Sequence, residues 1–109
     1  MADLPKTLGQ LAPAATTLTA LYTVPALTYT VVSSVIVCNQ NSTSSTFRIS
    51  VAVLGAADTP KQYLYYDVPI SKNNTFVATI GISLNAGDVV RVYAGNTNVS
   101  FNLMGVEVV

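Results

Sequence analysis

The sequence has 109 residues, of which half are hydrophobic and only 9% are charged. Soluble domains usually carry about 25% charged residues. Five basic and five acidic residues give a formal net charge of zero, and histidine is absent. This composition leaves few groups for acid–base, nucleophilic or metal chemistry. We therefore expect a non-enzymatic protein without cofactors, whose function lies in a contact surface.

The charge distribution also argues against two classes of partner. The basic residues are scattered along the chain, so neither a nucleic-acid stripe nor a polybasic membrane patch is expected. A net charge of zero removes the repulsion that keeps copies apart, which favours a homo-oligomer or self-contact in an assembly. No segment has the length of a spanning helix, and the N-terminus lacks the pattern of a signal peptide.

The first 17 residues differ from the rest, because two prolines and a glycine interrupt any helix or central strand. Three spaced leucines nevertheless give this segment apolar anchors. We expect an extended N-terminal arm over residues 1–17 that docks on a partner. The alternatives are a frayed terminus or a first segment lying back on its own domain. The expected arm contacts are Leu4, Pro5, Leu8, Leu11 and Pro13.

From residue 18 onward, short alternating segments are separated by turn clusters, which is typical of a sandwich or barrel. The expected strands are 18–24, 29–38, 46–54, 62–68, 75–82, 89–94 and 98–108. The clearest alternation places Phe47, Ile49 and Val51 on one face and Arg48 on the other. No helical periodicity is present. Residues 18–109 are thus expected to form a single antiparallel, jelly-roll-like β-sandwich of about seven or eight strands.

The last expected strand changes phase, because its apolar set shifts from Phe101 and Leu103 to Met104 and Val106. Such a change indicates a β-bulge, and Gly105 is the residue that would permit it. Glu107 would then lie on the solvent face.

The remaining reactive groups predict no catalytic or metal site. Cys38, at the end of an apolar run, is expected to be a small buried hydrophobe. The acidic residues form no calcium-binding run, and no phosphate-binding loop is present.

The tyrosines are better candidates for a functional surface. Tyr63 and Tyr65 should lie opposite Leu64 and Tyr66, and would form an exposed aromatic contact surface if their face points outward. The alternative is that these rings pack internally.

Several stretches together resemble small structural proteins of tailed bacteriophages, including the capsid cement (decoration) proteins of cyanophages. The resemblance covers nearly the whole chain and rests on LGQLAPAATT (8–17), LYTVPA (21–26), VSSVIVCN (32–39), TFRISV (46–51), YLYYD (63–67), LNAGDVVRVYA (84–94) and VSFNLMGVE (99–107). It implies a β-sandwich that binds the major capsid protein on the outer surface of the virion head and stabilises the shell, with the arm reaching across neighbours. Synthesis in the host cytoplasm is expected.

Similar domains occur in tail and fibre proteins. The alternative function is therefore a tail-fibre or adhesin module that binds a host receptor or glycan through the Tyr63 and Tyr65 surface.

Overall fold

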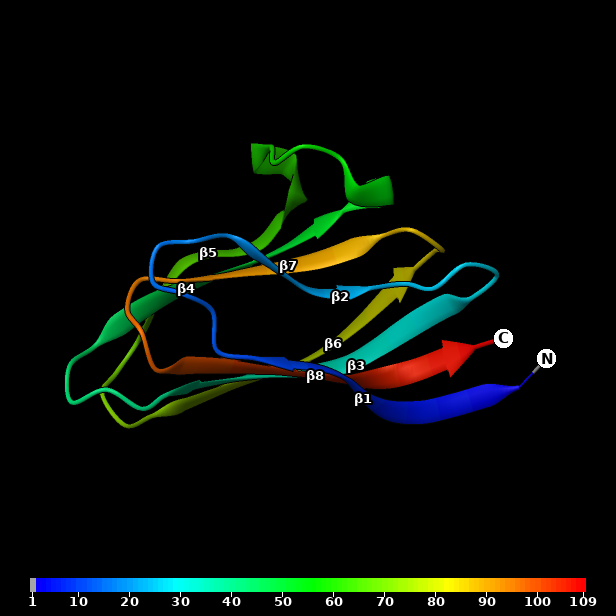
Figure 1. Ribbon diagram of the computed structural model, residues 1–109. Helices are drawn as coiled ribbons and strands as arrows, with labels where there is room; N and C mark the ends of the chain where they lie inside the picture. The colour runs from blue at the N-terminus through cyan, green and yellow to red at the C-terminus, as the bar shows by residue number, and fades with distance from the viewer. Residues whose placement is uncertain (1) are drawn as a thin grey trace.

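The computed structural model describes residues 2–109 and contains two packed antiparallel sheets (Figure 1). The strands are β1 (Asp3–Leu11), β2 (Thr19–Thr23), β3 (Tyr29–Asn39), β4 (Ser45–Ala52), β5 (Tyr63–Ile70), β6 (Thr75–Leu84), β7 (Val89–Ala94) and β8 (Val99–Val108). Two single-turn 3-10 helices, η1 (Val53–Gly55) and η2 (Pro60–Gln62), interrupt the connection from β4 to β5. The seven expected strands are all present. No helix within residues 2–109 is long and apolar enough to cross a membrane.

The strand order identifies the sandwich as a jelly roll. One sheet has the order β1-β8-β3-β6 and the other β2-β7-β4-β5. The first strand pairs with the eighth, the second with the seventh, the third with the sixth and the fourth with the fifth. This nesting of strand pairs across two sheets is the double Greek key of a jelly roll. The predicted fold class is confirmed.

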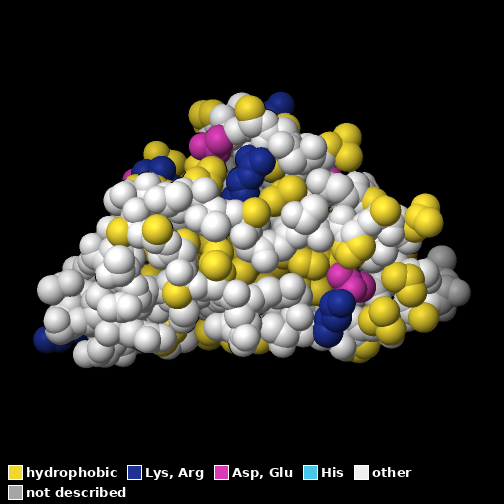
Figure 2. Space-filling model, viewed as in Figure 1, with side chains coloured by type: hydrophobic (Ala, Val, Ile, Leu, Met, Phe, Trp, Pro, Cys, Tyr) yellow, Lys and Arg dark blue, Asp and Glu magenta, His cyan; other side chains and the backbone are white. Residues whose placement is uncertain are grey.

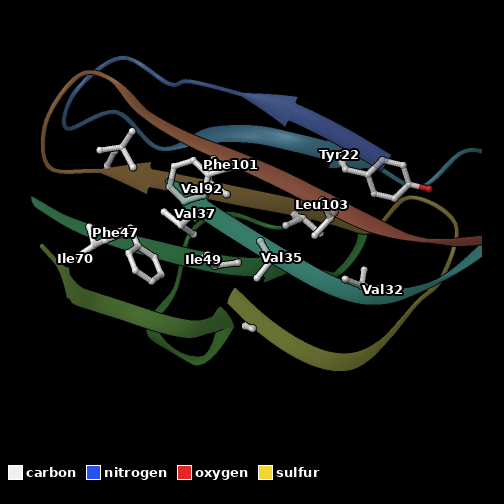
Figure 3. Close-up of a cluster of buried hydrophobic side chains, with 14 of the residues drawn as sticks. Tyr22, Val32, Val35, Val37, Phe47, Ile49, Ile70, Val92, Phe101 and Leu103 are labelled. Carbon is white, nitrogen blue, oxygen red and sulfur yellow. The ribbon is translucent and has the colours of Figure 1, made fainter. Parts of the chain in front are cut away.

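The core lies between the two sheets and is built from alternate residues of the strands (Figure 3). Phe47 from β4 and Phe101 from β8 are fully buried, and their ring centroids lie 6.3 Å apart at 73°. Edge-to-face ring pairs of this kind contribute about 0.5–1.5 kcal/mol beyond the burial of their area. Valine, leucine and isoleucine fill the space around them, as the period-two pattern predicts.

The prediction of a separate N-terminal arm is wrong. Residues 3–11 form β1, an edge strand that pairs with β8 along its whole length. Leu8 and Leu11 pack against the core of their own domain, and Pro13 is buried. Only Leu4 and Pro5, among the expected arm contacts, remain exposed. Backbone pairing to β8 therefore brings two of the three leucines, Leu8 and Leu11, against the core of the same domain. Met1 lies outside the described residues.

The predicted bulge in β8 is also absent. The strand runs through Gly105 without a break, and the register shifts lie in the neighbours instead: between Thr7 and Gly9 of β1, and between Val32 and Ser34 of β3. A Cβ atom on residue 105 would lie 2.4 Å from the carbonyl oxygen of Val31 and 3.0 Å from the Cα atom of Val32. The glycine therefore permits close approach of two strands rather than a bulge.

Because β8 keeps its phase, Glu107 points into the sandwich and is buried, contrary to expectation. One carboxylate oxygen lies 2.7 Å from Nζ of Lys6, and the other accepts a 2.5 Å hydrogen bond from the hydroxyl of Tyr22. The same hydroxyl lies 2.8 Å from Oγ1 of the buried Thr30. Lys6 from the edge strand thus supplies the charge that a buried carboxylate requires.

Candidate functional site

Strand β5 carries irregularities that decide which tyrosines reach the surface. Its register against β4 shifts twice, and Asp67 adopts a left-handed backbone conformation with φ of 49°. Tyr65 pairs with Ile49, which belongs to the core, whereas Tyr63 pairs with Ser50 of the opposite face. The two tyrosines therefore lie on opposite sides of the sheet. Bulges that re-aim side chains in this way are common beside functional sites.

The predicted Tyr63–Tyr65 surface pair is consequently wrong. Tyr65 packs inward, with its ring centroid 6.3 Å from that of Phe47 and 5.5 Å from that of Phe76. Tyr63 instead makes an edge-to-face contact with Tyr66, at a centroid distance of 5.1 Å and an interplanar angle of 90°. The outer aromatic pair is Tyr63 with Tyr66, because the extra residue in β5 reverses the alternation between them.

Arg48 forms the centre of this outer surface. It pairs in register with Tyr93 of β7, and its guanidinium carbon lies 4.2 Å from the ring centroids of both Tyr66 and Tyr93. Asp67 binds the guanidinium edge, with 2.6 Å from Nε to Oδ1 and 3.3 Å from Nη2 to Oδ2. The hydrogen bonds to Asp67 raise the pKa of Arg48 above its ordinary value. Two ring contacts and a bidentate carboxylate hold this side chain in one orientation.

Beside the arginine lies an open pocket of about 490 Å³, the tyrosine–arginine pocket, lined by Arg48, Asp58, Thr59, Pro60, Tyr63 and Tyr66. The hydroxyl of Tyr63 donates a 3.0 Å hydrogen bond to Oδ2 of Asp58. Burial, and then this hydrogen bond, raise the pKa of Tyr63. The hydroxyl of Thr59 has no hydrogen-bond partner within residues 2–109. The pocket combines aromatic walls with hydrogen-bonding groups of both kinds, a combination that suits binding a polar ligand.

Three polar side chains hold the wall of the pocket in place. Arg91 donates hydrogen bonds of 2.8 and 3.2 Å to the carbonyl oxygens of Ala56 and Gly55. Oδ1 of Asp88 accepts a 3.1 Å hydrogen bond from the backbone N–H of Leu54. Further along the loop, the side-chain amide of Gln62 donates to the carbonyl oxygen of residue 57 at 2.9 Å. The loop that carries the pocket wall is therefore anchored to β7 and to the turn before β7, and Gln62 ties two parts of the loop to each other.

The opposite side of the sandwich offers a different surface, which we call the neutral face. It consists of the outward side chains of the β1-β8-β3-β6 sheet from Pro5 onward, and none of them is charged; Asp3 lies at its end. Its residues include Pro5, Thr7, Gln10, Tyr29, Val31, Ser34, Ile36, Cys38, Thr75, Val77, Thr79, Ser83, Ser100, Asn102, Met104, Val106 and Val108.

About half of the neutral face is apolar, and Val77 in particular is 59% exposed. Cys38 is half-buried on this face rather than in the core, so its predicted burial is only partial. Across the face, Gln10 donates a 2.7 Å hydrogen bond to Asn102.

Charged groups gather on the other side of the molecule. Arg48, Asp67 and Arg91 project from the β2-β7-β4-β5 sheet, and Asp58 and Lys61 lie on the loop above it. Figure 2 shows several basic and acidic side chains over this sheet and loop, at the top of the view, and a few others lower in the molecule. The two outer surfaces of one sandwich thus differ in charge.

Comparison of this chain with protein-family models, with curated proteins and with solved structures gave no match.

Proposed function

We propose that this protein is a non-enzymatic structural component of a tailed-phage virion, a cement protein that binds the outer surface of the assembled head through its neutral face and stabilises the shell. The single observation that carries the proposal is the absence of charged side chains from that face. The resemblance of the sequence to capsid cement proteins supports the assembled major capsid protein as the partner in this proposal.

The physical argument concerns the cost of desolvation. A surface that docks on another protein loses its water, and an unpaired buried charge then costs several kcal/mol. The neutral face has no such cost, and its apolar groups gain about 25 cal/mol for each Å² removed from water. A shell presents the same site many times, so a modest contact is repeated over the whole head. Contact between neighbouring copies would add to the effect.

The proposal is tested by placing a charge on either side of the molecule. Val77 of β6 is 59% exposed on the neutral face, and Val53 of η1 is 64% exposed on the opposite side. We expect Val77→Lys to weaken binding to shells of the phage's major capsid protein by about tenfold or more, because the ammonium is buried on docking. Val53→Lys is the matched control and should bind as the unchanged protein does.

Binding is measured by co-sedimentation of the protein with assembled, undecorated shells over a range of protein concentrations. Equal binding by the two variants would contradict the assignment of the neutral face. Failure of the unchanged protein to sediment with shells would contradict the cement function itself.

The second candidate function is a receptor- or glycan-binding module of a tail fibre or adhesin. The observation that favours it is the tyrosine–arginine pocket, which takes the place of the Tyr63–Tyr65 surface expected from the sequence. It predicts binding of the protein to host cells, whereas the cement function predicts binding to shells.

A further inference from the structure

We propose that the tyrosine–arginine pocket is a binding site for a neutral saccharide. This inference gives the second candidate function its site and ligand class. It concerns the side of the molecule opposite the neutral face, so it applies whether the protein is attached to the head or to the tail. A failure of the saccharide proposal leaves the shell-binding proposal unaffected.

The first argument is that the pocket is preformed. Its volume of about 490 Å³ lies within the range of roughly 300–1,000 Å³ that is usual for small-molecule sites. Arg48 is fixed by two rings and a carboxylate, and the loop that provides Asp58 and Pro60 is fixed by hydrogen bonds from Arg91 and Gln62. A ligand would therefore bind without first having to order the site, which lowers the entropic cost of association.

The second argument is the match of chemical groups. A pyranose ring has an apolar C–H surface surrounded by hydroxyl groups that both donate and accept hydrogen bonds. The pocket offers aromatic surface from Tyr66, which is 58% exposed, and from Tyr63. Around that surface stand a carboxylate acceptor on Asp58, a hydroxyl on Tyr63 and guanidinium donors on Arg48. Apolar wall and polar rim thus lie within one cavity.

The third argument concerns charge and excludes ionic ligands. The positive charge of Arg48 is already paired with Asp67, so an anionic ligand would meet no free cation in the pocket lining and would lie beside the carboxylate of Asp58. A cationic ligand would lie beside the guanidinium of Arg48 itself. A neutral polyhydroxylated ligand avoids both repulsions and can still bind the two charged groups through hydrogen bonds.

The test uses the full-length protein labelled with ¹⁵N and titrated with neutral hexoses and N-acetylhexosamines, each beside its uronic acid or sulfated counterpart. We expect saturable shifts of amide signals around the pocket for at least one neutral sugar, with a Kd on the order of 1 mM. The charged counterpart of that sugar should bind about tenfold more weakly or not at all.

Variants locate the binding. Tyr66→Ala removes an aromatic wall and should weaken binding by about tenfold or more. Tyr63→Phe retains the ring and removes only the hydroxyl that bonds to Asp58, so it separates hydrogen bonding from packing. Leu64→Ala is the control, because Leu64 is exposed on the same strand but does not line the pocket.

As a control for folding, the amide signals from the core of each variant should keep the positions that they have in the unchanged protein. The proposal is overturned if no neutral sugar in the panel gives saturable shifts, if charged sugars bind as tightly as their neutral counterparts, or if Leu64→Ala weakens binding as much as Tyr66→Ala.

Discussion

The carboxyl group of Glu107 lies inside the sandwich, and its environment gives the protein a pH-dependent stability. The ion pair with Lys6, and then the hydrogen bond from Tyr22, lower the pKa of Glu107 below its ordinary value of 4.5, while burial opposes them. Burial and the nearby carboxylate raise the pKa of Tyr22 from 10.0 to about 12. The folded state therefore holds Glu107 ionised and Tyr22 neutral over a wide range of pH.

The stability of the protein should accordingly fall at both extremes of pH. Below about pH 4.5 the unfolded chain takes up a proton at Glu107 that the folded protein resists, so stability is lost as the pH falls through the lowered pKa. Above pH 10 the unfolded chain loses the proton of Tyr22, which the folded protein keeps until about pH 12, so stability again decreases. Urea unfolding as a function of pH measures both effects.

The variant Glu107→Gln tests the origin of the acid effect. It removes the titrating group, so the loss of stability between pH 5 and pH 3 should become smaller than in the unchanged protein. An unaltered slope in this range would show that other carboxylates cause the acid effect.

At the level of single residues, the alternation in the sequence correctly predicted that Arg48 lies on the face opposite Phe47 and Ile49. The same alternation misplaced Glu107. Met104 and Val106 are apolar but point outward, and in the sequence this pattern looks like a change of phase rather than an apolar outer surface. The buried carboxylate is stabilised by its ion pair with the half-exposed Lys6, a contact across almost the whole sequence, and by the hydrogen bond from Tyr22.

Strand pairing explains why the N-terminal segment was wrongly predicted to be an arm. A proline and a glycine in residues 3–11 argue against a central strand, yet an edge strand accepts proline where its missing N–H is not required. Local sequence could predict that this segment is extended. It could not predict whether the extended segment pairs with β8 or with another molecule, since that choice depends on contacts nearly a hundred residues away.

The close approach of β8 to β3 at Gly105 can be tested by substitution. Replacement by alanine would place a methyl group 2.4 Å from the carbonyl oxygen of Val31, which belongs to the backbone and has little freedom to move. We expect Gly105→Ala to lower the free energy of unfolding by about 1–3 kcal/mol or more, as overpacking does elsewhere. The midpoint of urea unfolding measures the change.

Gly81 of β6 provides the matched control, because a Cβ atom there meets nothing within 4 Å. Gly81→Ala should therefore change the stability by less than about 0.5 kcal/mol. Equal loss of stability in the two variants would mean that the cost arises from strand propensity rather than from the close approach of β8 to β3.

For the whole molecule, the important feature is that one sandwich has two unlike outer surfaces. The neutral face carries no charge, whereas Arg48, Asp58, Asp67 and Arg91 mark the other side. Composition alone indicated a contact protein with few charges, but it could not show that these charges are segregated. That segregation follows from which strands join in each sheet, and the sequence reveals it only after the jelly-roll topology is known.

In the proposed cement function, the unlike surfaces predict one orientation of the protein: the neutral face against the shell and the tyrosine–arginine pocket outward. The pocket and the loop 53–62 would then remain accessible to solvent, and from Pro5 onward the docking face contains no charge that must be desolvated.

Electron cryomicroscopy of the virion tests this orientation most directly. We expect jelly-roll density on the outside of the head, with the β1-β8-β3-β6 sheet facing the major capsid protein and the loop 53–62 facing outward. Density in which the β2-β7-β4-β5 sheet faces the shell, or in which this protein is found only on the tail, would contradict it.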